Sequence, residues 1–201
     1  MNNLQLHNAL SSNPVTAPYF LGVYARDNLP DRPFATPTLL ISNTDPSTES
    51  GEHWILFWVD KQSAESCCYF VDSYGMSPDF YCKEFTNFVT IQACDVFDYN
   101  DKCVQSVESD TCGQWCLYAA FQLCSEQSKN SKIVINALFD RFSVNPSNRA
   151  HNDDLVRRFV SRNFSRAIKQ HSKQQPLAIN LCMCCKQQFR VLSCRYRQLT
   201  A

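Results

Sequence analysis

The sequence predicts an α+β domain in which a β-sheet packs on helices. Segments rich in aromatic and β-branched residues, which are typical of strands, occur within the first hundred residues. Apolar residues at helical spacing follow, first in 112–124 and again in 152–173. The chain has 201 residues, and this length suits a single domain, 1–201.

The N-terminal part begins with polar residues and then becomes apolar. Residues 1–17 are expected to cover the surface or to begin as a short helix. The aromatic segment 18–30, PYFLGVYARDNLP, ends in turn residues. The segment 36–43, TPTLLISN, predicts a buried strand, and the composition of 45–52 predicts a turn.

The next two segments predict an antiparallel hairpin. HWILFWVD (53–60) and CCYFVDSYG (67–75) both have strand composition, and the polar residues 61–66 form the turn between them. The start of the first strand and the end of the second lie side by side in such a pair. The sequence therefore predicts that His53 and Asp72 are neighbours.

Further elements are expected on either side of the central stretch. Residues 77–88 predict a helix and 89–99 a strand, whereas 132–142 predict a helix. The tail, 177–198, is compatible with a strand followed by either a helix or a second strand.

The clearest helix is expected over 152–173, with Asn152 as its N-cap and Asp153 and Asp154 at the positive end of its dipole. One face is apolar and consists of Val156, Val160, Phe164, Ala167 and Ile168. The opposite face is basic and consists of Arg158, Arg162, Arg166, Lys169 and Lys173. Such a face suits the phosphate backbone of DNA without reading bases, although a solvated basic face is the ordinary alternative.

Charge is divided unevenly along the chain. Residues 1–131 hold 6 Lys and Arg against 16 Asp and Glu, whereas 132–201 hold 13 against 3. This polarity suggests an anionic partner for the C-terminal part, unless the two parts neutralise each other in the fold. No apolar run is long enough for a membrane span, and residues 1–14 lack the pattern of a secretory signal.

The twelve cysteines are scattered and partly adjacent, as in Cys67-Cys68. A reducing compartment with mostly free thiols is therefore expected. The spacing of the last four cysteines is not the paired arrangement of a zinc site, and no histidine is nearby, so we expect no metal. These four are Cys182, Cys184, Cys185 and Cys194.

The stretch 105–124, QSVESDTCGQWCLYAAFQLC, predicts a helix that begins near Cys112, capped by Asp110 or Thr111. The free N–H groups and dipole at a helix start favour a thiolate, which is the nucleophilic form of cysteine. Gly113 lacks a side chain and is expected to let a substrate backbone approach. The alternative is a cysteine that serves packing alone.

A cysteine nucleophile needs a base, and the base needs a group that orients it. Of the four histidines, only His53 stands at the start of a core strand, with Asp72 predicted beside it. The alternative is that both are ordinary turn residues. The backbone N–H of Cys112 and the amide of Gln105, seven residues upstream, are candidate donors to an oxyanion.

Several motifs together resemble the adenovirus proteinase (adenain) family, in the clan that includes ubiquitin-like-protein proteases. The matches are PYFLGVY (18–24), Glu52-His53-Trp54, YFVDSYG (69–75), Val104-Gln105 and, seven residues after the glutamine, Cys112-Gly113. They occur in unbroken order, and the sequence of histidine, acid and cysteine is that family's order.

The resemblance implies a single-domain, adenain-like fold with a mixed β-sheet packed on helices. It implies that His53 is the general base and then acid, and that Cys112 attacks the scissile carbonyl to form a thioester. Asp72 would orient the histidine; adenain has glutamate there, and aspartate occurs in the ubiquitin-like-protein branch. Gln105 would donate to the oxyanion, and Trp54 would shield the pair from water.

The function implied is that of a cysteine endopeptidase that matures precursor proteins of a virus or virus-like element. It would act as a monomer in the host nucleus and the virion, with structural precursors as substrates. One alternative is a protease that removes a ubiquitin-like modifier. Another is a decayed protease that serves as a DNA-binding structural component.

The resemblance also implies two cofactors. Members of the family are activated by a short viral peptide, through a disulfide and strand addition, and they use DNA. Cys94, eleven residues before Gln105, matches the linking cysteine and is expected to be exposed at a sheet edge, with Cys103 as a fallback. The alternative for Cys94 is a buried thiol in a strand.

Overall fold

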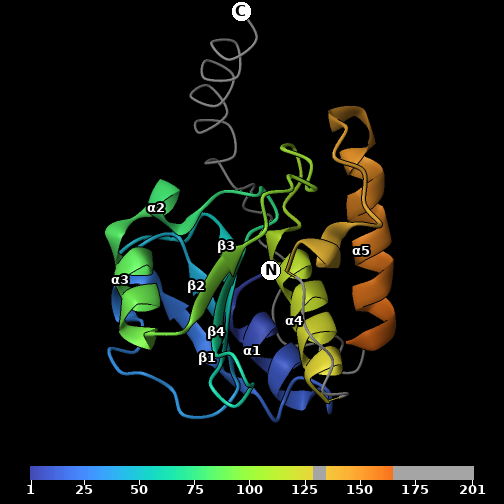
Figure 1. Ribbon diagram of the computed structural model, residues 1–201. Coiled ribbons are helices and arrows are strands. Elements are labelled where there is room, and N and C mark those ends of the chain that lie inside the picture. Colours follow the sequence, from blue (N-terminus) through green and yellow to red (C-terminus); the bar gives the residue numbers. More distant parts are fainter. Residues whose placement is uncertain (129–134, 165–201) are drawn as a thin grey trace, which may run out of the picture.

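A computed structural model describes residues 1–128 and 135–164 of the protein (Figure 1). The strands are β1 (Phe20–Ala25), β2 (Thr38–Asn43), β3 (Trp54–Asp60), β4 (Cys67–Val71) and β5 (Val96–Tyr99). The α-helices are α1 (Asn3–Ser12), α2 (Pro78–Tyr81), α3 (Lys83–Gln92), α4 (Cys112–Ser128) and α5 (Arg149–Asn163). Short 3-10 helices are η1 (Arg26–Asn28), η2 (Ile135–Phe139) and η3 (Pro146–Asn148).

The five strands form one mixed sheet in the order β1-β2-β3-β4-β5. The two outer pairs, β1 with β2 and β4 with β5, are parallel, whereas β2, β3 and β4 run antiparallel to one another. A mixed sheet together with helices confirms the predicted α+β class. None of the helices in the two described ranges is long and apolar enough to cross a membrane.

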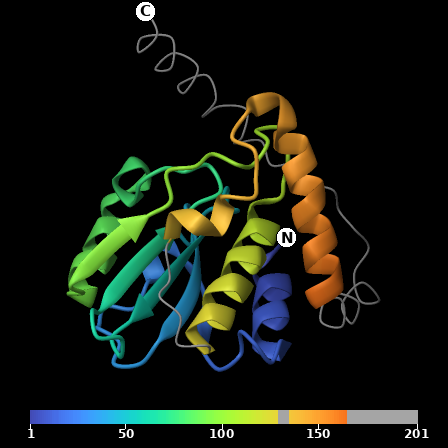
Figure 2. The same cartoon turned by 45° about the vertical axis from the view of Figure 1, so that its right-hand side comes forward.

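The sheet is buried on both faces, because alternate side chains of its central strand enter different apolar clusters. Leu56 and Trp58 of β3 join the cluster formed with α1 and α4. Ile55 and Phe57 join the other cluster, which is closed by the aromatic side chains of α3. The result is a layered molecule with α3 on one face of the sheet, α4 and α1 on the other, and α5 outside α4 (Figure 2).

The predicted hairpin is present. Strands β3 and β4 are antiparallel partners, with Leu56 opposite Val71 and Asp60 opposite Cys67. Strand β4 ends at Val71, earlier than the predicted strand over 67–75, because Asp72 begins a turn in which the Gly75 N–H donates to its carbonyl. The buried strand expected over 36–43 is also present, as β2.

The segment 77–93 differs from the prediction. The helix expected over 77–88 is interrupted at Cys82, whose backbone is extended (φ −168°), so that α2 and α3 are separate. Helix α3 continues to Gln92 and ends at a left-handed Ala93 (φ 48°). Residues 89–92 of the strand expected over 89–99 are therefore helical, and only β5 pairs with the sheet.

Packing explains this difference. Phe85 and Phe88 stand three positions apart on one side of α3, and both are buried against Phe57 of β3. A strand beginning at Val89 would break the helix that places them there. Burial of two aromatic rings outweighs the small strand preference of β-branched residues such as Thr90.

The C-terminal elements also begin at other positions than expected. Within 132–142 the described residues form the short 3-10 helix η2, and α5 begins at Arg149 rather than after an Asn152 cap. Asn152 is instead buried inside α5 and donates to the carbonyls of Val104 and Ser143. The end of the predicted helix over 152–173 and the tail 177–198 lie outside the described residues. The apolar face is confirmed for Val156, Val160 and Phe164, which are buried.

Candidate active site

The predicted neighbours His53 and Asp72 lie together. His53 directly precedes β3, and Asp72 directly follows β4. The antiparallel register brings these ends together, and the His53 Nε2 atom lies 2.6 Å from the Asp72 Oδ1 atom. Both residues are buried, with 4% and 1% of their surfaces exposed. A carboxylate in this position fixes the orientation of the ring and leaves Nδ1 free to face another group.

The Asp72 carboxylate is held by a ring of donors. The backbone N–H of Tyr74 donates to Oδ1, while the N–H of Met76 and the hydroxyl of Tyr81 donate to Oδ2 at 2.9 Å each. The backbone of Asp72 is fixed as well, because the Asn100 side chain accepts from its N–H and donates to its carbonyl. Strand β5, which ends next to Asn100, therefore helps to place the acid.

Two tyrosine rings lie against the His53 imidazole. The Tyr74 ring stacks at 4.8 Å between centroids and 28° between planes, and the Tyr81 ring at 5.9 Å and 21°. Burial and the nearby Asp72 charge raise the pKa of Tyr81 well above its ordinary value. Its hydroxyl therefore stays protonated and remains a donor to the carboxylate.

Cys112 is the first residue of α4 and is half-buried. Its side chain lies near the His53 ring, because a hydrogen bond and the charge of Cys112 are among the causes that raise the pKa of that ring. Burial alone would lower the pKa of His53, but the charge and hydrogen bond of Asp72, followed by the contact with Cys112, raise it to about 10. The ring is therefore protonated at neutral pH.

The start of α4 differs from the expected cap. The carbonyl of Thr111 accepts from the Trp115 N–H, as an N-cap carbonyl does. The Thr111 hydroxyl, however, donates to the Asp153 carboxylate of α5 at 2.7 Å. Asp110, the other expected cap, is exposed and lies 3.9 Å from Arg157.

Gly113 packs closely against the N-terminal segment, and its expected role in the approach of a substrate stays a prediction. A Cβ atom at this position would lie 3.1 Å from Cβ of Met1 and 3.5 Å from a methyl group of Leu6. The N-terminal segment thus covers the open side of the glycine. Trp54 belongs to the same contact region, because its Nε1–H donates to the Met1 carbonyl at 3.1 Å.

The Gln105 side chain is fully buried, and three neighbouring groups bond to it. Its oxygen accepts from the Ser73 hydroxyl at 2.6 Å. Its Nε2 donates to the Ser109 carbonyl at 3.2 Å and to the Tyr74 hydroxyl at 3.3 Å. An oxyanion would have to replace one of these two acceptors.

Cys94 lies in the turn between α3 and β5, next to the edge strand of the sheet, and is half-buried rather than exposed. Its sulfur lies 3.9 Å from the Gln92 carbonyl, and burial raises the pKa of its thiol. Cys103 is also half-buried, and burial raises its pKa to about 11.

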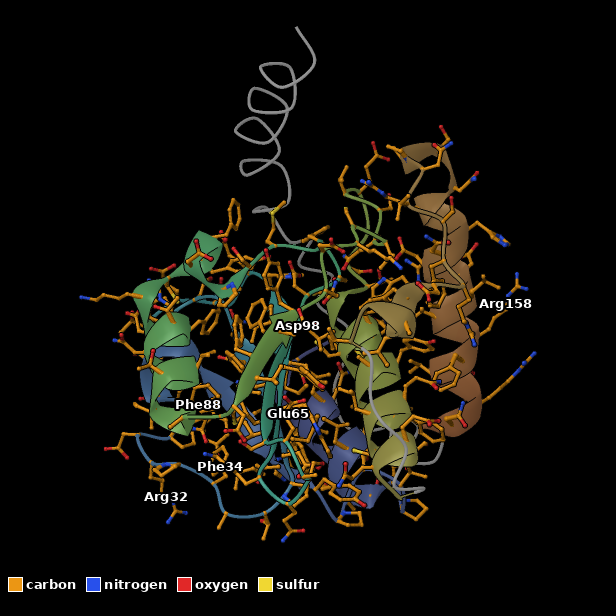
Figure 3. The ribbon with its side chains drawn as sticks, viewed as in Figure 1. Arg32, Phe34, Glu65, Phe88, Asp98 and Arg158 are labelled. Atoms are coloured by element: carbon orange, nitrogen blue, oxygen red, sulfur yellow. The ribbon has the colours of Figure 1, made fainter. Side chains whose placement is uncertain are left out.

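The predicted basic face is described only in part. Arg158 and Arg162 are exposed on α5, and Figure 3 shows Arg158 on the side that faces away from the sheet. The remaining members, Arg166, Lys169 and Lys173, lie outside the described residues, as do the four C-terminal cysteines. Within the described ranges, no group of three His, Cys, Asp or Glu side chains is arranged to hold a metal ion.

Three residues near the candidate site were not expected there: Tyr81, Asn100 and Asp153. Tyr81 and Asn100 act on Asp72 across turns, and no local sequence pattern indicates those contacts. Asp153 was expected to interact with the dipole of its own helix, but it binds the start of α4 instead. Comparison of the chain with models of protein families and with curated proteins gives no match.

Proposed function

We propose that the protein is a cysteine endopeptidase with an adenain-like fold. The observation that carries this proposal is the position of the buried His53 ring, which lies 2.6 Å from the Asp72 carboxylate and near Cys112, one of the groups that raise its pKa. These three side chains come from the start of a strand, the end of its partner and the start of a helix. A buried carboxylate, an imidazole ring and a half-buried thiol, in this order, are the parts of a catalytic triad with a cysteine nucleophile.

In the proposed reaction the Cys112 thiolate attacks the scissile carbonyl carbon, and the protonated His53 gives its proton to the departing amine. The resulting thioester is then attacked by water, from which His53 removes a proton, and the acid product leaves as the thiolate reforms. Asp72 keeps the ring oriented through both steps. The Cys112 N–H donates to the oxyanion, joined by Gln105 once its amide releases the Tyr74 hydroxyl.

We further propose precursor proteins of a virus or virus-like element as substrates, cleaved by the monomer in the host nucleus and the virion. This extension follows from the motif resemblance. The aspartate at position 72 favours the second candidate, a protease for ubiquitin-like modifiers. Probes that carry an electrophile at the modifier C-terminus would label Cys112 in that case, whereas cleavage of capsid-precursor peptides alone supports the first.

Replacement of the nucleophile tests the proposed chemistry. Cys112→Ala should abolish cleavage of a protein or peptide substrate, because no other group in the triad can form the thioester. Cys103→Ala is the matched control, since Cys103 is also half-buried but lies outside the triad. Equal turnover of Cys112→Ala and the unmodified chain would refute the proposal.

We also propose that a short peptide activates the protein by adding a strand at β5 and forming a disulfide with Cys94. The edge position of β5 and the place of Cys94 just before it support this. Cys94→Ser should lose covalent attachment of a cysteine-containing peptide, measured by mass spectrometry under non-reducing conditions. Equal attachment in that variant would assign the disulfide to another thiol, with Cys103 the first to examine.

A further inference from the structure

We propose that Asp153 of α5 positions the nucleophile, because it binds both ends of the segment that runs from Gln105 to Cys112. The proposal rests on the assignment of Cys112 as nucleophile. Asp153 is 1% exposed, and its carboxylate reaches across from α5 to the start of α4. It is a positioning residue that acts through Thr111 and Ser106, and it does not itself contact the sulfur in the proposed role.

Each oxygen of the Asp153 carboxylate holds a different part of this segment. Oδ1 accepts from the Thr111 hydroxyl at 2.7 Å and from the Trp115 indole N–H at 2.8 Å. Oδ2 accepts from the Ser106 backbone N–H at 3.1 Å. Ser106 directly follows Gln105, and Thr111 directly precedes Cys112, so one side chain fixes the oxyanion amide and the nucleophile relative to each other.

The residue before Asp153 in α5 also helps to hold the segment from Gln105 to Cys112. Asn152, 2% exposed, donates to the carbonyl of Val104, which directly precedes Gln105. Inside the segment, the Ser109 hydroxyl bonds to the Thr111 hydroxyl at 2.8 Å, and the Ser109 carbonyl accepts from Gln105. The segment thus has little freedom to move unless its bonds to α5 break.

The energetics of burial favour this role over simple helix packing. A buried carboxylate costs free energy unless it is well bonded, and the three donors to Asp153 are all neutral groups. An apolar residue would join α4 to α5 at lower cost. Asp154, the next residue along, shows the usual alternative, because it is exposed and pairs with Arg157 at 3.0 Å.

Positioning of this kind should appear in kcat rather than in KM. The segment sets the distance from the Cys112 sulfur to His53 and from Gln105 to the reacting carbonyl. A displacement of about 1 Å in such a group can lower a rate by roughly 100-fold. KM should change little, because the contacts of the substrate with other parts of the surface would remain.

Two variants with close controls test the proposal. Thr111→Val keeps the shape of the side chain but removes the donor to Asp153, and we expect kcat to fall about 10- to 100-fold with KM within about threefold. Asp153→Asn should give a similar loss. Thr111→Ser restores the hydroxyl and should recover most of the rate, and Asp154→Asn should leave kcat and KM unchanged.

The alkylation rate of Cys112 by iodoacetamide, followed by mass spectrometry of its peptide, provides a readout that needs no substrate. It should fall about tenfold in Thr111→Val, because the thiolate loses its alignment with His53. If Asp153→Asn does not fold, the threonine variants decide. A Thr111→Val protein with a lower melting temperature but normal kcat and normal alkylation would overturn the proposal and leave Asp153 a purely structural residue.

The same experiment separates this inference from the proposed function. Suppose that the unmodified protein cleaves no peptide while Cys112 is alkylated faster than the other half-buried thiols. If Thr111→Val then removes that difference in rate, the positioning role of Asp153 is supported and the proposed substrate class is wrong. If Cys112→Ala remains active, the assignment of the nucleophile is wrong. In that case the positioning proposal falls with it.

Discussion

At the scale of single residues, the site depends on the charge of His53. Its ring is buried, and burial opposes that charge, yet the Asp72 carboxylate at 2.6 Å and the Cys112 contact raise its pKa to about 10 from an ordinary 6.5. A group whose pKa is higher in the folded state binds its proton more tightly there, so folding is coupled to protonation. The stability of the protein should therefore depend on pH through the His53–Asp72 pair, and replacement of Asp72 should remove this dependence.

Stability should therefore depend on pH with a definite sign. The contribution of the raised His53 pKa is fully present below about 6.5 and is lost as the pH rises through about 10. The difference in unfolding free energy between the unmodified chain and Asp72→Asn should be largest near pH 6 and should shrink toward pH 10. Urea unfolding at a series of pH values measures it, and a difference that grows with pH contradicts the assigned pairing.

Activity provides an independent check on the same pair. Proton donation by His53 to the departing amine requires the imidazolium, so the alkaline limb of kcat/KM should lie near pH 10. Asp72→Asn removes the charge that raises this pKa, and the limb should move toward neutral pH. An alkaline limb that does not move would mean that another group sets it.

At the scale of elements, the turn after β4 links the acid to the segment 101–105. Gly75 has φ +71°, and a Cβ atom there would lie 2.7–2.8 Å from backbone atoms of Asp101 and Lys102. The turn therefore requires glycine for its conformation and for the close approach of the second chain segment. The Ser73 carbonyl of the same turn accepts from the Gln105 N–H, so a shift here would reach the site.

Gly75→Ala should lower the free energy of unfolding by about 1–3 kcal/mol, because a non-glycine residue is strained in this backbone region. Turnover of the folded fraction should fall too, as the segment 101–105 is displaced. Gly22→Ala is the control: the atoms nearest to its Cβ would belong to the Tyr24 side chain, at 3.1–3.2 Å, rather than to backbone, and the loss should be smaller. Denaturant unfolding compares the two, and equal losses would mean that the turn tolerates a side chain.

Elements whose partners are close in sequence could be predicted. The hairpin of β3 and β4 follows from two aromatic, β-branched runs and a short turn, and it alone places His53 beside Asp72. The contact of Asp72 with Asn100, 28 residues away, and that of Asp153 with Ser106, 47 residues away, depend on how complete elements pack. Sequence periodicity carries no information about such contacts.

At the scale of the whole molecule, the division of charge along the chain has a structural counterpart in α5. The acidic part of the chain, residues 1–131, contains the sheet and all three members of the proposed triad. Helix α5 belongs to the basic part, residues 132–201. Arg158 and Arg162 are exposed on this helix. The helix itself lies on the outside of the layered fold (Figure 2). We propose that this face tracks the phosphate backbone of DNA.

Arg157 provides a matched contrast on the same helix. Its guanidinium lies 3.0 Å from the Asp154 carboxylate and 3.9 Å from that of Asp110. Two carboxylates already compensate its charge, although all of these groups are exposed and the attraction is screened by salt. Its replacement should therefore affect a bound polyanion less than replacement of Arg158 or Arg162.

Binding of random-sequence DNA should weaken steeply with salt, because each neutralised phosphate releases counterions. Arg158→Gln and Arg162→Gln should each reduce the slope of log K against log salt by about 1, with no dependence on base sequence. Arg157→Gln should change the slope by less. Fluorescence anisotropy across a salt series measures all three, and binding that is absent, independent of salt or equally affected by every variant would remove DNA from the partners of α5.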